Sequence, residues 1–267
     1  IAIDYNIQGP SFTVSTACSS GGDAINTACM CMQSGKADIM LAVGAESVLC
    51  PLVIYSLANA KALSRRNDSP STASRPFDVT RDGFVIGEGG GALVLETEEH
   101  ALARGAKIYA EIRGCGNTDD AYHVTAPHPE GRGAIACMKQ AIAEAGINPS
   151  DIGYINAHGT ATNKGDTVET SSIKKVFGNT LPYVSSTKGA TGHMMGAGGI
   201  TETITCVKAI ETGTVPPTIN LNEVDPECAG IDFVANTAKK AEINFAMSNA
   251  FGFGGQNSSI IVGKYGK

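Results

Sequence analysis

One cysteine of this chain stands where a nucleophile is expected. Cys18 lies among small residues in the run VSTACSSGG, residues 14–22, at the point where an apolar strand is expected to turn into a helix. Unpaired backbone N–H groups and the positive end of a helix dipole favour thiolate over thiol at such a place. The run therefore predicts a nucleophilic Cys18 with a lowered thiol pKa. The alternative for an isolated cysteine is a buried structural residue.

Two histidines shift the balance toward chemistry. His158 lies in the run YINAHGTAT, residues 154–162, where a short apolar strand enters a Gly/Thr turn. His193 lies in the run SSTKGATGHMMGA, residues 185–197, where a strand end is followed by glycines and a helix. Either histidine alone would be a satisfied core residue. Together with Cys18, each at a strand end, they predict thiol chemistry in which two imidazoles manage charge and protons.

The elements that must position these residues alternate between helix and strand. Ala24, Ala28 and Met32 recur at helical spacing before Gly35, which predicts a helix directly after the cysteine turn. The other expected helices are residues 133–145, 167–177 and 200–210, the expected strands are residues 38–46, 91–96, 107–113, 245–249 and 259–263, and residues 64–80 are expected to form a polar loop. This alternation predicts an α/β protein whose sheets are covered by helices.

Composition limits the function classes. A net charge of -6 disfavours a non-specific nucleic-acid binder, and the chain has no apolar run of membrane-spanning length and no signal peptide pattern. The eight cysteines include no CxxC pair and no His-rich cluster, so a zinc site is rejected. All except Cys18 are expected to be structural thiols in a reducing compartment, which predicts a cytoplasmic enzyme with neither nucleic acid nor membrane as a partner.

Further motifs follow in a fixed order. They are RPFD at residues 75–78, RDGF at 81–84, GEG at 87–89, DAYH at 120–123 and NAFGFGG at 249–255. With the cysteine and histidine runs, and over the whole chain, this pattern resembles the β-ketoacyl-acyl carrier protein synthases of the elongating Cys-His-His type, closest to synthase II. Condensing enzymes that prime chains, and chalcone-type synthases, use a Cys-His-Asn arrangement, and His193 argues against them.

The resemblance implies a thiolase-like fold with five layers, α/β/α/β/α, built from duplicated halves. Cys18 and His193 each precede a glycine cluster, a helix and a second glycine, as a duplicated half would require. Family members begin well before the nucleophile. Residues 1–267 are therefore expected to form one incomplete ketoacyl synthase domain, the end of the first half with the complete second half, with the N-terminal portion absent from this chain.

The resemblance also implies an acyltransferase reaction. An acyl group passes from carrier-protein phosphopantetheine to Cys18, malonyl-carrier protein loses carbon dioxide, and the resulting carbanion attacks the thioester, which elongates a fatty acyl chain by two carbons. His158 and His193 would donate Nε2–H groups to the enolate oxygen, and the backbone N–H groups of Cys18 and Phe253 would form an oxyanion hole. No cofactor is required, because phosphopantetheine arrives on the carrier protein.

Two supporting groups follow from the same resemblance. Lys188 would lie near the histidines and position them electrostatically, with a solvated surface lysine as the alternative. Asn156, Glu202, Ser248 and Asn249 match an oxygen-rich cluster that holds a structural monovalent cation in the family. The alternative for Glu202 is a simple ion pair with Lys188.

The substrate path is implied as well. Thr160 and Thr162 resemble hydroxyls that bind the pantetheine amides, with turn capping as the alternative. Phe251 and Phe253, in a glycine-rich loop, resemble the gate between the active site and the acyl pocket. Residues 120–133 would form the mobile loop that faces this gate.

Several alternatives remain open. A cysteine hydrolase would use Cys and His, but it leaves the second histidine and Lys188 without a role. A non-catalytic partner subunit, like the chain-length factors of aromatic polyketide systems, shares the fold but lacks the nucleophile. A polyketide ketosynthase is the closest competitor among enzymes. The expected partners are an acyl carrier protein, acyl and malonyl thioesters, and a second copy of the chain in a homodimer.

Overall fold

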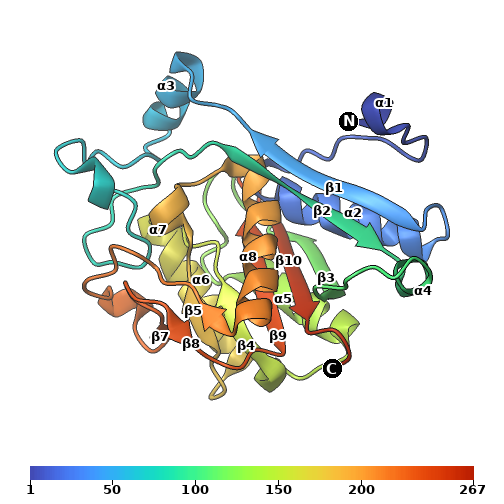
Figure 1. The fold of residues 1–267 in the computed structure, drawn as a ribbon. Coiled ribbons are helices and arrows are strands. Elements are labelled where there is room, and N and C mark those ends of the chain that lie inside the picture. Colours follow the sequence, from blue (N-terminus) through green and yellow to red (C-terminus); the bar gives the residue numbers. More distant parts are fainter.

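The computed structural model describes residues 1–267 as two sheets with helices between them and on one outer face. β1 (Ile39–Glu46) and β2 (Gly89–Glu96) form an antiparallel pair that lies across the top of Figure 1, above α2 (Ser20–Gln33) and α8 (Gly198–Thr212). These two helices also pack on a six-stranded sheet with the order β3-β10-β9-β4-β5-β7. On the far face of that sheet lie α5 (Arg132–Ala145) and α6 (Asn163–Phe177).

The large sheet is mixed. Its strands are β3 (Glu111–Asp119), β4 (Ile152–Asn156), β5 (Tyr183–Ser185), β7 (Asp232–Phe233), β9 (Phe245–Phe251) and β10 (Gln256–Gly263), while β6 (Thr214–Val215) and β8 (Lys239–Lys240) form a small separate pair. The short helices are α1 (Ala2–Tyr5), α3 (Pro51–Asn59), α4 (Glu98–Ala103) and α7 (Lys188–Thr191). β4 runs parallel to β5 and β9, whereas β10 is antiparallel to β3 and β9. No helix is long and apolar enough to span a membrane.

Two apolar clusters hold these layers together. Between the two sheets lies a cluster that includes Ile25 of α2, Ile200 of α8 and Ile260 of β10, all buried. On the other face of the large sheet, Met138 of α5 and Met247 of β9 belong to a second cluster. Because the large sheet is covered on both faces, its central strands β9 and β10 are buried at nearly every position.

Most expected elements are present with small changes at their ends. The helix after the cysteine turn ends before Gly35, and α5 ends at Gly146, whose φ of +66° suits glycine. α6 begins four residues before the predicted start, and the two closing strands pair as β9 and β10. α3, which protrudes at the upper left of Figure 1, was not predicted.

Two predicted strands are wrong. The segment before Cys18 has no regular structure between Ile7 and Thr16, because no neighbouring strand pairs with it. The strand predicted at residues 107–113 begins instead at Glu111 and continues to Asp119. Pairing with β10 sets these bounds, since Gly263 lies opposite Glu111 and Gln256 opposite Asp119.

The predicted polar loop at residues 64–80 contains only a short 3-10 turn, but it is anchored rather than solvated. Asp78 is buried, and its carboxylate accepts hydrogen bonds from Arg75 Nε at 3.0 Å and from the backbone N of Asn222 at 2.9 Å. The pKa of Asp78 is lowered because these donors, with Thr80, outweigh the effect of burial. The loop is thereby fixed against the segment around Asn222.

The helices α2 and α8 meet through backbone atoms at their N-terminal ends. A Cβ added at Gly21 would lie 2.6 Å from the backbone N of Ile200 and 3.0 Å from the Cα of Gly199. Gly199 is equally close to the backbone of Gly22. Glycine is required at these positions by close approach, and the approach brings the start of α2, after Cys18, next to the start of α8, after His193.

Candidate active site

Cys18 lies in a tight turn at the start of α2. Residues Ala17–Ser19 form one turn of 3-10 helix, and Ala17 has a φ of +51°, in the left-handed region. The two serines that follow Cys18 satisfy backbone carbonyls of this turn: Ser19 Oγ donates to Thr16 O at 2.8 Å, and Ser20 Oγ donates to Ala17 O at 2.7 Å. An alanine held in that region signals local strain at a functional turn.

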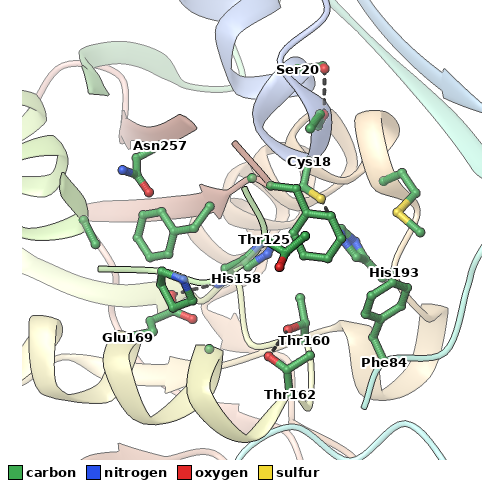
Figure 2. A pocket seen from close by; sticks show the side chains of 18 of the residues that line it. Cys18, Ser20, Phe84, Thr125, His158, Thr160, Thr162, Glu169, His193 and Asn257 are labelled. Atoms are coloured by element: carbon green, nitrogen blue, oxygen red, sulfur yellow. Dashed lines mark hydrogen bonds between the residues drawn. The ribbon is translucent and has the colours of Figure 1, made fainter. Parts of the chain in front are cut away.

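The two histidines come from different parts of the chain and meet beside the thiol. His158 follows β4, and His193 lies between α7 and α8. His193 Nε2 lies 3.1 Å from Cys18 Sγ, and the two imidazole rings are 5.3 Å apart and nearly perpendicular, at 87°. Figure 2 shows both rings beside the thiol. The structure thus brings together three side chains that are up to 175 residues apart.

The surroundings keep both imidazoles neutral. Burial lowers the pKa of His158 and of His193 well below 6.5, and the nearby Lys188 charge lowers both further. The Nδ1 atoms of both rings are buried without a hydrogen-bond partner. Neutral imidazoles can donate an N–H hydrogen bond to a developing negative charge without first losing a proton.

The predicted lowering of the Cys18 pKa is wrong in direction. The backbone N–H groups of Phe253 and Cys18 and the Lys188 charge do lower the thiol pKa, as a helix start should. Burial has the larger effect, because it removes the thiolate from water, and the pKa of Cys18 is raised above 9.0. The resting nucleophile is therefore a neutral thiol.

This direction gives a pH prediction. If the thiol pKa lies above 9.0, the thiolate fraction should rise roughly tenfold for each pH unit through pH 9, without a plateau. The second-order rate of Cys18 alkylation by iodoacetamide, followed by peptide mass spectrometry between pH 6.5 and 9.5, should show that slope. Exposed Cys50 is the internal reference.

A plateau of the Cys18 alkylation rate below pH 8 would show instead that the thiol pKa is lowered, as the sequence predicts. The site assignment has its own check, because the same maps report every thiol. Adducts on Cys29, Cys137 or Cys206 with Cys18 unmodified would contradict the assignment of Cys18 as the reactive thiol.

Lys188 is buried rather than solvated. Only 2% of the residue is exposed, and Nζ forms an ion pair with Glu202 Oε1. The alternative of a simple pair between these two residues is therefore present, yet it leaves Glu202 Oε2 buried without a partner. The pair places one positive charge close enough to affect the pKa values of Cys18, His158 and His193.

The predicted cation ligands divide between two faces of the sheet. Asn156 Oδ1, like Glu202 Oε2, is buried without a partner, and Ser248 lies opposite Asn156 in the register of β4 and β9. The side chain of Asn249 is on the other face, where Oδ1 accepts from Ser259 Oγ at 2.8 Å. Neighbouring strand residues point to opposite faces, so the side chain of Asn249 does not face the oxygens of Asn156 and Glu202, and the cation site stays a prediction.

The cavity beside Cys18 has a volume of about 270 Å³, and Thr160 and Thr162 are among the residues that line it. Their hydroxyl oxygens lie 3.0 Å apart, and Figure 2 shows the two side chains next to each other. Thr162 is the residue before α6, but its side chain makes no capping hydrogen bond. The capping alternative is therefore not what the structure shows for Thr162, and both hydroxyls face the cavity.

Phe251 and Phe253 also line this cavity. The Phe251 ring lies 6.0 Å from the His158 ring, and the Phe253 N–H contacts the Cys18 thiol. Gly254, in the loop that carries Phe253, has a φ of +91°, and its backbone N donates to Val124 O at 2.7 Å. The loop at residues 120–133 is thus hydrogen-bonded to the phenylalanine loop. Gating by this pair of loops stays a prediction.

Sequence reasoning missed two buried acids on α6. Glu169 Oε1 accepts from His158 N and Oε2 accepts from Gly159 N, each at 2.8 Å. Figure 2 shows Glu169 beside His158. Asp166 accepts from Phe77 N at 2.7 Å and from Ala161 N at 3.1 Å. Burial raises the pKa of each acid to about 7.

A helical stripe could have revealed them. Asp166, Glu169 and Thr170 share spacing with Ile173 and Phe177, which are apolar and buried. Acids on the buried stripe of a helix must be hydrogen-bonded. The stripe extends before the predicted start of this helix, so Asp166 was left outside it.

Comparison with known proteins agrees with this geometry. Residues 1–101 match the model of the beta-ketoacyl synthase N-terminal domain, and residues 109–222 match that of the C-terminal domain. A 3-oxoacyl-[acyl-carrier-protein] synthase 2 of Rhizobium meliloti (strain 1021) is 48% identical over 99% of this chain and 63% of its own length. The synthase 2 of Coxiella burnetii is 47% identical over 99% of this chain and 64% of its own.

Solved structures give the same result for the fold. A type II polyketide ketosynthase, bound to a hexaketide and in complex with its acyl-carrier protein, superimposes with a TM-score of 0.95 at 38% identity. It is covered over 65% of its chain, and this chain over 98%. A beta-ketoacyl synthase from Burkholderia phymatum STM815 gives 0.94 at 39% identity, over 64% of its chain and 98% of this one. The predicted thiolase-like fold is confirmed.

The chain spans a little under two thirds of the length of these relatives. Within that span, both family models match in the order that the fold requires, and the synthase 2 sequences align over almost every residue. The resemblance read from the cysteine and histidine runs is therefore confirmed. This chain belongs to the beta-ketoacyl synthase family.

Proposed function

We propose that this chain carries out the decarboxylative Claisen condensation of malonyl-acyl carrier protein with an acyl group held on Cys18. The observation that carries the proposal is the contact of Cys18 Sγ with His193 Nε2 at 3.1 Å, with His158 beside it. A thiol next to two neutral imidazoles suits an acyl-thioester intermediate and an enolate in the same cavity.

The first step is acyl transfer. Cys18 sulfur attacks the thioester carbonyl of the acyl-carrier protein, and the oxygen of the tetrahedral intermediate is held by the backbone N–H groups of Cys18 and Phe253. Hydrogen bonds from these two N–H groups lower the pKa of the Cys18 thiol in the resting protein. The carbon–sulfur bond to phosphopantetheine breaks, and the Cys18 proton ends on the departing carrier thiol.

The second step breaks a carbon–carbon bond and forms another. Malonyl-carrier protein loses carbon dioxide, and the electron pair delocalises onto the thioester oxygen, which faces the N–H groups of His158 and His193. The carbanion carbon then attacks the acyl carbonyl on Cys18, and the Cys18 thiolate leaves. Sulfur serves in both steps, because it is nucleophilic in the first step and leaves readily as a thiolate in the second.

Lys188 and a monovalent cation have supporting roles in the proposal. Burial keeps the imidazoles neutral and the Lys188 charge adds to this effect, which matches hydrogen-bond donation rather than proton transfer. The unpartnered oxygens of Asn156 and Glu202 fit a small cation, which would neutralise a buried carboxylate oxygen. Its role would be structural, with Ser248 opposite Asn156 completing the oxygen set.

The substrates and partners belong to the proposal too. Thr160 and Thr162 would hydrogen-bond the pantetheine amides, while Phe251 and Phe253 would gate the acyl chain. Acyl carrier protein would deliver both thioesters, as it is bound to its ketosynthase in the related complex. A homodimer and a cytoplasmic location complete the proposal.

A polyketide ketosynthase is the second candidate, because the complex with a TM-score of 0.95 holds a hexaketide. Fatty acyl elongation is preferred, since the synthase 2 relatives are 47–48% identical and the polyketide enzyme 38%. A chain-length-factor-like subunit is disfavoured by the presence of Cys18 beside His193.

Product analysis tests the function. The chain is supplied with malonyl-carrier protein and saturated acyl-carrier proteins, and the products are followed by mass spectrometry. A 3-oxoacyl product two carbons longer supports the proposal. Repeated extension without reduction would favour the polyketide alternative, and no product with any acyl donor would reject the condensing function.

Glu169 gives a further prediction. In Glu169→Gln an amide NH₂ replaces one of the two oxygens that accept from His158 N and Gly159 N, so one backbone N–H faces another donor. An unsatisfied buried donor costs about 1–3 kcal/mol, and malonyl decarboxylation should fall roughly 10- to 100-fold. Carbon dioxide release measures it.

The matched control is Glu144→Gln. Glu144 Oε2 accepts from the backbone N of Cys115 at 3.1 Å, away from the cavity. This variant should keep decarboxylation within about twofold, since surface substitutions away from the site cost little. Equal losses in both variants would mean that Glu169 has only a general stabilising role.

A further inference from the structure

A further buried carboxylate, that of Asp23, lies next to the nucleophile, and the reaction as described does not use it. Asp23 is in the first turn of α2, only 4% exposed. No lysine, arginine or histidine pairs with it in the structure, which describes every residue of the chain. A buried carboxylate without a cation needs its hydrogen bonds.

Three neutral donors supply them. Oδ2 accepts from Thr16 Oγ1 and from Ser19 Oγ, the latter at 3.0 Å, and Oδ1 accepts from Asn117 Nδ2 at 2.5 Å. An ionised carboxylate only accepts hydrogen bonds, and here each of the three neighbouring groups donates one. The carboxylate therefore links three points of the backbone, two in the turn around Cys18 and one on β3.

Those three points enclose the nucleophile. Thr16 precedes Cys18 by two residues, Ser19 follows it, and Asn117 belongs to β3 of the large sheet. One oxygen atom thus holds both sides of the turn in which Ala17 has its left-handed φ. The hydrogen bond from Asn117 anchors that turn to β3. The Cys18 side chain makes no hydrogen bond to this strand, since its thiol contacts His193.

The same turn supports the oxyanion hole. A Cβ added at Gly252 would lie 3.0 Å from Thr16 O and 3.2 Å from Cys18 N, so the phenylalanine loop packs directly on this turn. A shift of Thr16 would move the Cys18 N–H and the contact with the loop that carries Phe253. Misplacement of a reacting group by about 1 Å costs on the order of 10²-fold in rate.

We infer that Asp23 is a positioning residue that fixes the Cys18 turn by bridging Thr16, Ser19 and Asn117. The inference rests on the proposed function for its acylation readout. Its effect is confined to the thiol and the oxyanion hole beside it, since His158 and His193 are held by other elements. A positional defect should therefore separate the two half-reactions, whereas general destabilisation would lower both.

Asp23→Asn tests this, since it keeps the volume and removes one acceptor and the charge. The acylation rate of Cys18 by acyl-carrier protein should fall about 10- to 100-fold, and iodoacetamide alkylation of Cys18 should also slow. Malonyl decarboxylation should stay within about twofold, because it does not use the thiol. Asp151→Asn, which removes a carboxylate that caps a surface turn, is the matched control.

Thr16→Val provides a second variant in case Asp23→Asn does not fold, because it deletes one of the bonds and leaves the carboxylate in place. It should slow acylation in the same selective way, and the effects of Thr16→Val and Asp23→Asn should be non-additive. Equal losses of acylation and decarboxylation, or no loss of acylation, would overturn the inference. Should the wild-type chain fail to decarboxylate malonyl-carrier protein, the proposed function fails, and Cys18 alkylation still decides the role of Asp23.

Discussion

Cys18→Ala should lose condensation by at least about 10³-fold while it continues to release carbon dioxide from malonyl-carrier protein. Condensation needs a sulfur atom to hold the acyl group. Decarboxylation needs only the donors that face the enolate oxygen, and His158 and His193 are held by β4 and by the segment between α7 and α8. Condensation is measured as 3-oxoacyl product, and decarboxylation as carbon dioxide.

The control is Cys31→Ala, a thiol of α2 outside the cavity. It should retain both activities. Residual condensation in Cys18→Ala within tenfold of the wild type would show that another group carries the acyl chain. Loss of both activities with the fold intact would show that the thiol takes part in decarboxylation, contrary to the proposed division of roles.

His193→Ala should lose both activities. Removal of one preorganised donor to an oxyanion lowers the rate by about 10²–10³-fold, and His193 also contacts the thiol at 3.1 Å. Carbon dioxide release from malonyl-carrier protein and product formation should therefore fall together. The contrast with Cys18→Ala makes the pair of variants informative, since each removes one partner of the same contact.

His100→Ala is the histidine control, because His100 lies on the surface and pairs with Glu96. It should behave as the wild type in both assays. Unchanged decarboxylation in His193→Ala would refute the role proposed for His193. The imidazoles of His158 and His193 are both neutral at working pH, so the rate of decarboxylation should show no titration near pH 6.5.

The reactive residues could be predicted from the sequence because each lies in a local pattern. Small residues around Cys18, and strand ends before His158 and His193, need only neighbours in the chain to be recognised. Helical spacing followed by glycine fixed the helix after the thiol and α5 in the same way. Local rules apply where local contacts decide the structure.

Features that depend on distant partners could not be predicted. The pKa of Cys18 depends on how much protein covers the thiol, and a helix start says nothing of that. The first residue of β3 depends on where β10 ends, and the segment before Cys18 has no strand because it has no partner. Burial and pairing are properties of the assembled fold.

The buried acids show the same limit. Glu169 and Asp23 are acidic residues in helices, where a solvated face is the usual reading. Their acceptor atoms meet donors that follow β4 or lie on β3, so their roles appear only when those strands are in place. The side chain of Asn249 shows the converse, since alternation on β9 turns it away from Asn156.

The glycine contact between α2 and α8 has a consequence for how the sequence of this protein can diversify. Side-chain packing can be retuned one methylene at a time, but a backbone-to-backbone contact offers no intermediate size. The separation of the thiol from the imidazole of His193 is thus insulated from substitutions that enlarge or shorten the cavity. Libraries that vary the lining of the cavity should keep Cys18, His158 and His193, and should leave Gly21, Gly22 and Gly199 unchanged.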